Sequence, residues 1–445
     1  MSNYDDNNWI NQSSEADSFT YDDEDYAYMA ERERRKKAVK KRRTVIAIII
    51  ASVLIISVGA VFIVPAIINA KNSIPEVTET PVKTPAPVTN ATALPSPSVN
   101  ILVTPSPEPV FIENSPFAEP LRYYFTSLST DEKGQYNTIK KAISEFRPSV
   151  EFSTTSTKRI MEIAQYIFYD YPEYFWFDGS VKIEYASVGN IYTGDLYFDY
   201  TCSEVEKATM QQELTASTTD ILNKLSKLSD YDKVKTAYEY IINKSKYDDR
   251  VLEQGCYPVL VRGRGVCSSY TCALNYLLGK TGIKTIYAAG ISEGVDHAWS
   301  LVNLDNEWYQ VDVTWGDPTA LDGHDELSYD YLLLNDAEML KNHKYDNPGF
   351  YPPCNATKYN YYRYEGLYLE TYDYDKLLSI LNTCRRNGTK FIFKCSNLVV
   401  FKETEYNLFK KDVAWKLFDD AGIGNVYTTI EYYTDPDALT ISINI

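Results

Sequence analysis

The feature that most restricts how this chain can fold is an uncharged run from Thr44 to Ala70. At about 1.5 Å per residue, a helix over this run exceeds the roughly 30 Å hydrocarbon core of a bilayer. Residues 31–43 are rich in arginine and lysine, whereas Lys71 and Lys83 are the first positive residues after the run. The positive-inside rule therefore predicts a retained signal anchor in the plasma membrane, with the N-terminus cytoplasmic and everything after the span extracellular.

Two segments flank this predicted transmembrane helix, and neither is expected to bury a core. Residues 1–43 begin with many acidic residues and little aliphatic content, which is typical of a disordered tail. Residues 71–117 alternate prolines with threonine, serine, valine and alanine, which favours an extended stalk. The basic run before the span is suited to anionic lipid headgroups. With a net charge of −17 and positive residues otherwise dispersed, no nucleic acid is expected as a partner.

The remaining chain is too long for one average core, so it is expected to divide into subdomains. We expect an N-terminal α+β subdomain over 118–230, a core over 231–320 and a C-terminal α/β domain over 321–445. Periodicity and capping signals predict a hairpin, several helices and three strands. The hairpin is expected near 182–201, the helices near 131–146, 156–169, from Ser203, over 229–243, near 374–385 and near 403–420, and the strands at 390–394 and near the C-terminus.

Residues suited to nucleophilic chemistry begin at Cys267, which follows the turn Arg262-Gly263-Arg264-Gly265-Val266. Apolar residues at helical spacing continue to Leu278, so Cys267 is predicted at a helix start. The positive end of a helix stabilises a thiolate and, later, an oxyanion. Arg262 and Arg264 either favour the thiolate electrostatically or form a solvated surface pair.

The stretch from His297 to Trp315 predicts a hairpin with its turn at Asp305-Asn306. Pairing Leu304 with Glu307 makes His297 and Asp312 diagonal neighbours on one face of the sheet. A slip of one residue would turn Asp312 away. A cysteine nucleophile needs a base, and the base needs a group that orients it, so this order of thiol, imidazole and carboxylate indicates a catalytic site.

The segments GRGVCSSYTCALNYLL and DHAWSLVNLDNEWYQVDVTWGDP resemble the core of the transglutaminase-like superfamily in its bacterial extracytoplasmic form, over roughly residues 233–320. The resemblance implies an α+β, papain/transglutaminase-like fold in which the cysteine helix packs on an antiparallel sheet. It implies that Cys267 is the nucleophile, His297 the base and Asp312 the orienting carboxylate.

Two further residues are candidates for the oxyanion or substrate site. Tyr257 occupies the place where relatives often carry an aromatic residue upstream of the cysteine. Trp299, two residues after the base in the motif, is the other, and core packing is its alternative explanation. No glutamine stands just before Cys267, which leaves the second oxyanion donor unassigned.

Metal binding is the main rival explanation for the cysteines and His297. Cys256, Cys267 and Cys272 form no CxxC pair, and no second histidine stands at ligand spacing, so no metal and no cofactor are expected. The chain has seven cysteines without framework spacing. We therefore expect a fold that does not depend on disulfides, with Cys267 unpaired.

These features together predict a surface-anchored thiol acyl-transfer enzyme that acts on protein or cell-wall peptide amides. Hydrolysis would make it a cysteine peptidase or amidase, and transfer to an amine would make it a transglutaminase; the triad is common to both. A non-catalytic cell-wall or protein-binding module on a stalk is the alternative, and the 39 tyrosines would suit one. A third hypothesis is a membrane-anchored assembly factor whose function depends on the cytoplasmic tail.

Overall fold

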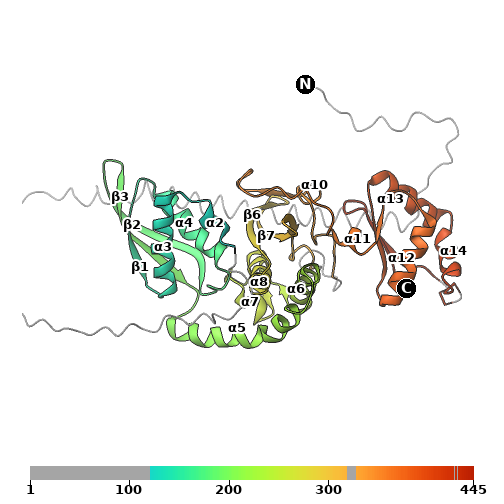
Figure 1. The fold of residues 1–445 in the computed structure, drawn as a ribbon, viewed down its shortest axis with the longest axis horizontal. Helices are drawn as coiled ribbons and strands as arrows, with labels where there is room; N and C mark the ends of the chain where they lie inside the picture. Colours follow the sequence, from blue (N-terminus) through green and yellow to red (C-terminus); the bar gives the residue numbers. More distant parts are fainter. Residues whose placement is uncertain (1–120, 318–326, 425, 428) are drawn as a thin grey trace, which may run out of the picture. The chain divides into compact units, whose positions relative to one another are not determined.

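The computed structural model describes residues 121–317, 327–424, 426–427 and 429–445 (Figure 1). The predicted tail, span and stalk lie outside these residues. In the part described, no helix combines the length and the hydrophobicity needed to cross a bilayer. All of these residues belong to one compact unit, 105–445. The division of this unit into three subdomains stays a prediction.

The first part combines helices with an antiparallel three-stranded sheet of order β1-β3-β2. Ser203 and Glu206 form the predicted capping box at the start of α5. The buried Asp170 carboxylate accepts hydrogen bonds from the backbone N–H groups of Tyr124 and Phe125, which holds α2 against α4. The elements are α2 (Tyr123–Thr126), α3 (Thr130–Ser144), β1 (Ser149–Thr154), α4 (Thr157–Asp170), β2 (Phe177–Val188), β3 (Ile191–Tyr200) and α5 (Glu204–Leu225).

The central part holds an antiparallel four-stranded sheet of order β8-β7-β6-β9. Helix α8 packs on β6 and β7, and α6 packs on α8. The expectation of a cysteine helix on an antiparallel sheet is confirmed. The elements are α6 (Asp230–Lys244), β4 (Lys246–Tyr247), α7 (Tyr257–Leu260), β5 (Arg264–Gly265), α8 (Cys267–Gly279), β6 (Thr285–Ser292), β7 (Val295–Leu304), β8 (Glu307–Val311), α10 (Asp336–Met339) and β9 (His343–Tyr345).

The hairpin of β7 and β8 has the predicted register, with Leu304 opposite Glu307. Its turn residues Asp305 and Asn306 have φ of 53° and 64°, the left-handed conformation that a two-residue type I′ turn requires. Asp305 also accepts hydrogen bonds from the Lys358 ammonium at 2.6 Å and the Tyr359 hydroxyl at 2.7 Å. A later segment of the chain therefore fixes this turn.

The C-terminal part contains a four-stranded sheet of order β10-β11-β13-β12, in which only β10 and β11 run parallel. A single helix near 403–420 was the wrong prediction. Asn397 caps a helix that starts earlier, and Asp412, with φ of 56°, separates it from α14. The elements are α11 (Tyr361–Tyr364), β10 (Tyr368–Leu369), α12 (Tyr374–Asn387), β11 (Phe391–Cys395), α13 (Leu398–Glu405), the π-helix η1 (Tyr406–Lys410), α14 (Val413–Asp420), β12 (Tyr432–Asp435) and β13 (Thr440–Ile443).

Tyrosine is prominent among the side chains that fill these layers. The largest fully buried side chains include Tyr136, Tyr238, Tyr270, Tyr309 and Tyr362. Buried tyrosine hydroxyls need partners, and Tyr136 donates to Asp170 while Tyr270 donates to Asp317, both at 2.7 Å. Much of the unusual tyrosine content therefore contributes to packing.

Candidate active site

Cys267 is the first residue of α8, as the sequence predicts. Val266 before it is extended and supplies no side-chain cap for the N–H groups of the first turn. Cys267 is partly exposed, whereas residues 268–278 of the same helix are buried. The thiol therefore lies at the accessible, positive end of an otherwise buried helix.

The start of α8 is held in place by side chains on either side of Cys267. The Ser268 hydroxyl donates to the carbonyl of Gln254 at 3.1 Å, and the Ser269 hydroxyl donates to the carbonyl of Glu253 at 2.9 Å. Farther along, the Ser300 hydroxyl of β7 donates to Asn275 at 2.9 Å. These bonds fix the thiol relative to the strand that carries the imidazole.

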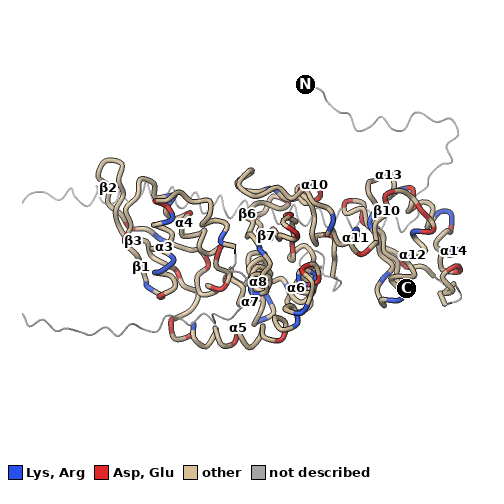
Figure 2. Tube along the Cα trace, viewed as in Figure 1, with Lys and Arg blue, Asp and Glu red and all other residues tan. Residues whose placement is uncertain are grey.

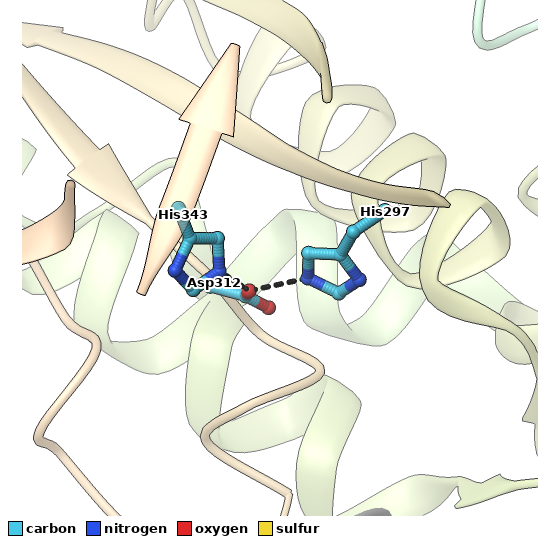
Figure 3. A group of neighbouring side chains, drawn as sticks. All are labelled: His297, Asp312 and His343. Atoms are coloured by element: carbon cyan, nitrogen blue, oxygen red, sulfur yellow. Dashed lines mark hydrogen bonds and ion pairs between the residues drawn. The ribbon is translucent and has the colours of Figure 1, made fainter. Parts of the chain in front are cut away.

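His297 and Asp312 lie side by side, as the predicted register of the two hairpin strands requires. Nε2 of His297 lies 2.6 Å from Oδ2 of Asp312 (Figure 3). The other carboxylate oxygen, Oδ1, accepts the backbone N–H groups of Thr314 at 2.8 Å and Trp315 at 3.0 Å. Asp312 is fully buried, so its orientation is fixed by these partners. Nδ1 of His297 points away from the carboxylate and is left for another partner.

Cys267 acts on this ring, since it contributes both a hydrogen-bonding and a charge effect that raise the pKa of His297. Burial opposes the charged imidazolium, but Asp312 and Cys267 together outweigh it and raise the pKa of His297 to about 10. Burial also opposes the charged form of Asp312. The charges and hydrogen bonds of His297 and His343 reverse this effect and hold the pKa of Asp312 well below its usual range. The geometry thus favours a proton on the imidazole.

His343 is the residue of the site that sequence reasoning missed. Its Nε2 lies 2.9 Å from the same Asp312 Oδ2 that contacts His297. Its Nδ1 lies 2.7 Å from Oδ1 of Asn342, whose amide donates to the Tyr331 hydroxyl at 2.8 Å. His343 is buried on β9, the edge strand beside β6. The sheet therefore continues past residue 320, where the predicted core ends.

The ligand-type atoms of His297, Asp312 and His343 lie within 4.8 Å of one another. A metal ion would bind such a set. Both ring nitrogens, however, approach one carboxylate oxygen at hydrogen-bonding distance. Two N–H donors on Oδ2 account for the arrangement, and the expectation of no metal stays a prediction.

The two candidate oxyanion or substrate residues have other partners. The Tyr257 hydroxyl donates to the Glu213 carboxylate. The Trp299 indole N–H donates to Oε1 of Gln310 at 2.7 Å, and its buried ring stacks on Tyr345. Neither polar group is directed to the thiol, because each already has an acceptor. For Trp299 the core-packing alternative is therefore the better description.

All seven cysteines are unpaired and all lie in the described residues. Five are buried, and only Cys202 and Cys267 are partly exposed. Burial and the nearby Glu206 raise the pKa of Cys202, although Lys207 opposes this effect. Cys202 therefore provides an unactivated counterpart to Cys267.

Residues 219–313 match the model of the transglutaminase-like superfamily core. This segment, which spans Cys267, His297 and Asp312, is therefore similar to the transglutaminase-like core.

Solved structures similar to this chain include a transglutaminase, with 17% identity, a TM-score of 0.23, and coverage of 30% of this chain and 44% of that one. A candidate cysteine protease from Cytophaga hutchinsonii has 15% identity, a TM-score of 0.21, and coverage of 32% and 63%. A candidate protease from Parabacteroides distasonis has 14% identity, a TM-score of 0.19, and coverage of 37% of each chain. The chain spans less than two thirds of each of these structures. A search of the curated proteins finds no match.

Proposed function

We propose that this protein is a cysteine-dependent acyl-transfer enzyme acting on peptide or protein amides. One observation carries the proposal. A partly exposed thiol at a helix start raises the pKa of an imidazole whose Nε2 lies 2.6 Å from a buried carboxylate. The three groups have the roles of nucleophile, base and orienter that thiol acyl transfer needs.

In the proposed reaction, the sulfur of Cys267 attacks the carbonyl carbon of a substrate amide. The carbonyl oxygen takes the negative charge and is stabilised by N–H groups at the start of α8. The imidazolium of His297 then gives its proton to the leaving amine as the C–N bond breaks, which produces a thioester and a neutral imidazole. His297 next removes a proton from water or an amine, and this nucleophile releases the acyl group. Asp312 keeps the ring oriented throughout.

We infer that hydrolysis is the main outcome. Cys267 is partly exposed, so water has access to a thioester at this position. Transfer to an amine would require a second substrate to reach the thioester before water does. The enzyme is thus proposed as a peptidase or amidase, with transglutaminase activity as the second outcome of the same chemistry.

The same proposal places the enzyme outside the plasma membrane. The uncharged run 44–70 and the basic residues before it support an anchor with a cytoplasmic N-terminus. The proline-rich residues 71–117 would carry the catalytic part away from the bilayer. Proteins and cell-wall peptides are the amide substrates available there.

Mass spectrometry of peptide and wall fragments tests the proposal directly. Purified full-length protein should add the mass of water to an amide substrate, or join an amine to it with loss of ammonia. Cys267→Ala should abolish both products, and His297→Ala should reduce them by at least 10²-fold. Products that persist in Cys267→Ala would contradict the proposal.

Alkylation tests the thiol without any knowledge of the substrate. Iodoacetamide near pH 6 should label Cys267 far faster than Cys202, because only Cys267 has an imidazolium beside it. His297→Ala should slow the labelling of Cys267 and leave that of Cys202 unchanged. Equal, slow labelling of both cysteines would favour the non-catalytic binding module instead.

A further inference from the structure

A charged cavity of about 410 Å³ lies next to the turn that leads into Cys267. Three arginines and two carboxylates line it, together with two apolar side chains. The charged residues are Asp248, Arg250, Glu253, Arg262 and Arg264. None of them takes part in the thiol chemistry described above, so the cavity needs its own explanation.

The walls of this cavity are bonded directly to the residues around the thiol. The backbone N–H of Asp248 donates to the carbonyl of Gly265 at 3.0 Å, and the carbonyl of Glu253 accepts the Ser269 hydroxyl at 2.9 Å. Arg264 precedes Cys267 by three residues, and a chain this short spans about 10 Å at most. A substrate peptide with about three extended residues beyond the thiol would therefore be long enough to reach the cavity.

The charged residues that line the cavity sum to one more positive than negative charge, and the neighbouring Asp249 acts electrostatically on Arg250. Arg250 contacts both oxygens of Asp248, at 2.7 and 2.9 Å, and Arg262 lies 2.5 Å from Glu253. Arg264 is exposed and forms no ion pair with a residue of the described ranges. Its charge still contributes to the lowered pKa of Asp248, after the larger effects of Arg250. Burial opposes the charged form of Glu253, but its hydrogen bonds and the charges of Arg262 and Arg264 lower its pKa as well. Both acids are thus ionised at neutral pH, and Arg264 is the lining arginine without a direct ion pair to either of them.

The excess of positive charge among the lining residues is confined to this part of the molecule. The whole chain has a net charge of −17, and Figure 2 shows acidic and basic positions interspersed along most of the described trace. Guanidinium groups bind carboxylates through paired N–H donors with fixed geometry. A carboxylate therefore matches Arg264 and is the anionic group that peptides carry, while the two acids already present bind Arg250 and Arg262.

We propose that this cavity is a substrate subsite that binds a carboxylate of the peptide whose amide Cys267 attacks, with Arg264 as its principal contact. This inference rests on the proposed acyl-transfer function and narrows it to acidic peptide substrates. The carboxylate belongs either to an Asp or Glu side chain or to a free C-terminus, and the chemistry of recognition is the same.

Matched peptides distinguish these two sources. The substrate series is one peptide cleaved by the full-length enzyme, prepared with Glu or Gln beside the scissile amide and with a free or amidated C-terminus. The preferred carboxylate should raise kcat/KM by about tenfold over its neutral counterpart, as expected for a charge-assisted hydrogen bond. Arg264→Gln should remove this preference, and Arg264→Lys should restore part of it. Arg386→Gln, which removes an exposed guanidinium from α12, should leave it intact.

Equal kcat/KM for all four peptides, or a preference that survives Arg264→Gln, would overturn the subsite. A second measurement separates this failure from failure of the proposed function. The ratio of alkylation rates of Cys267 by iodoacetate and iodoacetamide reports the local charge without any turnover. Arg264→Gln should lower this ratio severalfold relative to wild type and Arg386→Gln. An unchanged ratio overturns the charged subsite even when peptides are cleaved, whereas absence of cleavage in the wild type refutes the proposed function alone.

Discussion

The ionisation of His297 determines how this site responds to pH. Its folded-state pKa of about 10 exceeds the ordinary value of 6.5. The protonated ring therefore stabilises the fold fully below pH 6.5, and this contribution is lost as pH rises through about 10. Because the proposed acylation uses the same proton, kcat/KM should also fall on the alkaline side near pH 10.

The Cys267→Ala variant tests how much of this effect comes from the sulfur. Cys267 raises the pKa of His297 through a hydrogen bond and a charge. Its removal should lower the pKa of His297, which NMR titration of the imidazole resonance measures. Cys202→Ala is the matched control and should leave the titration unchanged. An imidazole that titrates near pH 6.5 in the wild-type protein would contradict the raised pKa of His297.

His343 is expected to act as a positioning residue for Asp312. His343→Phe keeps the ring volume but removes the N–H that contacts Oδ2 at 2.9 Å. Loss of a buried partner of a charged group should cost about 1–3 kcal/mol of stability and reduce kcat/KM about tenfold. The pKa of Asp312 should also rise, because His343 is one cause of its lowering. Protonation of Asp312 removes the charge that orients His297, so the loss of kcat/KM at acid pH, the acid limb of the pH profile, should occur at higher pH than in the wild type.

Tyr345→Phe provides the control for this variant on the same strand. The Tyr345 hydroxyl is buried and has no hydrogen-bond partner among the described residues. Its removal should leave stability and the acid limb unchanged or slightly raise stability. An acid limb that does not move in His343→Phe would leave His343 with a packing role only.

Residues of the site could be predicted from the sequence where the interactions that place them are between residues close together along the chain. Asp305-Asn306 favours one turn type, that turn sets the register, and the register places His297 beside Asp312. His343 follows Asp312 by 31 residues along the chain and lies on a strand of only three residues. Three residues carry no periodicity, so nothing in the local pattern links His343 to the site.

At the scale of elements, the position of α8 depends on the close approach of Gly265. A Cβ at Gly265 would lie 2.7 Å from Cγ2 of Val259 and 2.8 Å from Cβ of Ser269. Gly265→Ala should therefore displace the first turn of α8, cost about 1–3 kcal/mol and reduce the rate of Cys267 alkylation. Thermal unfolding and iodoacetamide labelling measure the two effects.

Gly134→Ala is the matched substitution in a helix without such a contact. Gly134 lies inside α3, and no atom lies within 4 Å of a Cβ built there. This variant should gain about 0.5–1 kcal/mol from helix propensity and label at the wild-type rate. Equal stability changes in the two variants would show that crowding at Gly265 is not what positions α8.

Helix ends marked by side-chain caps were predictable, whereas interruptions were not. Ser203 and Ser229 cap α5 and α6 as expected. The interval 403–420 kept helical spacing, yet the helix breaks at Asp412, which adopts a left-handed conformation that its neighbours do not signal. Helical spacing alone therefore does not locate such a break, because most of a helix's stability in a protein comes from tertiary packing.

At the scale of the whole molecule, the fold is held without covalent cross-links. The seven cysteines are all unpaired, and five are buried. Alkylation of the unfolded chain without a reductant should therefore modify seven thiols, and dithiothreitol should leave the unfolding temperature unchanged. Fewer modified thiols before reduction, with seven after it, would show a disulfide that the structure does not contain.

Helix α8, the hairpin and β9 belong to one sheet assembly, although β9 lies thirty residues beyond the family-matched segment 219–313. The family-matched segment is thus shorter than the sheet and helix assembly that holds the site. A fragment trimmed to that segment, or grafted onto another scaffold, would retain every residue of the triad and still lose a support of its acid. In such a fragment the carboxylate of Asp312 would keep His297, but it would keep the N–H groups of Thr314 and Trp315 only if residues beyond 313 were retained.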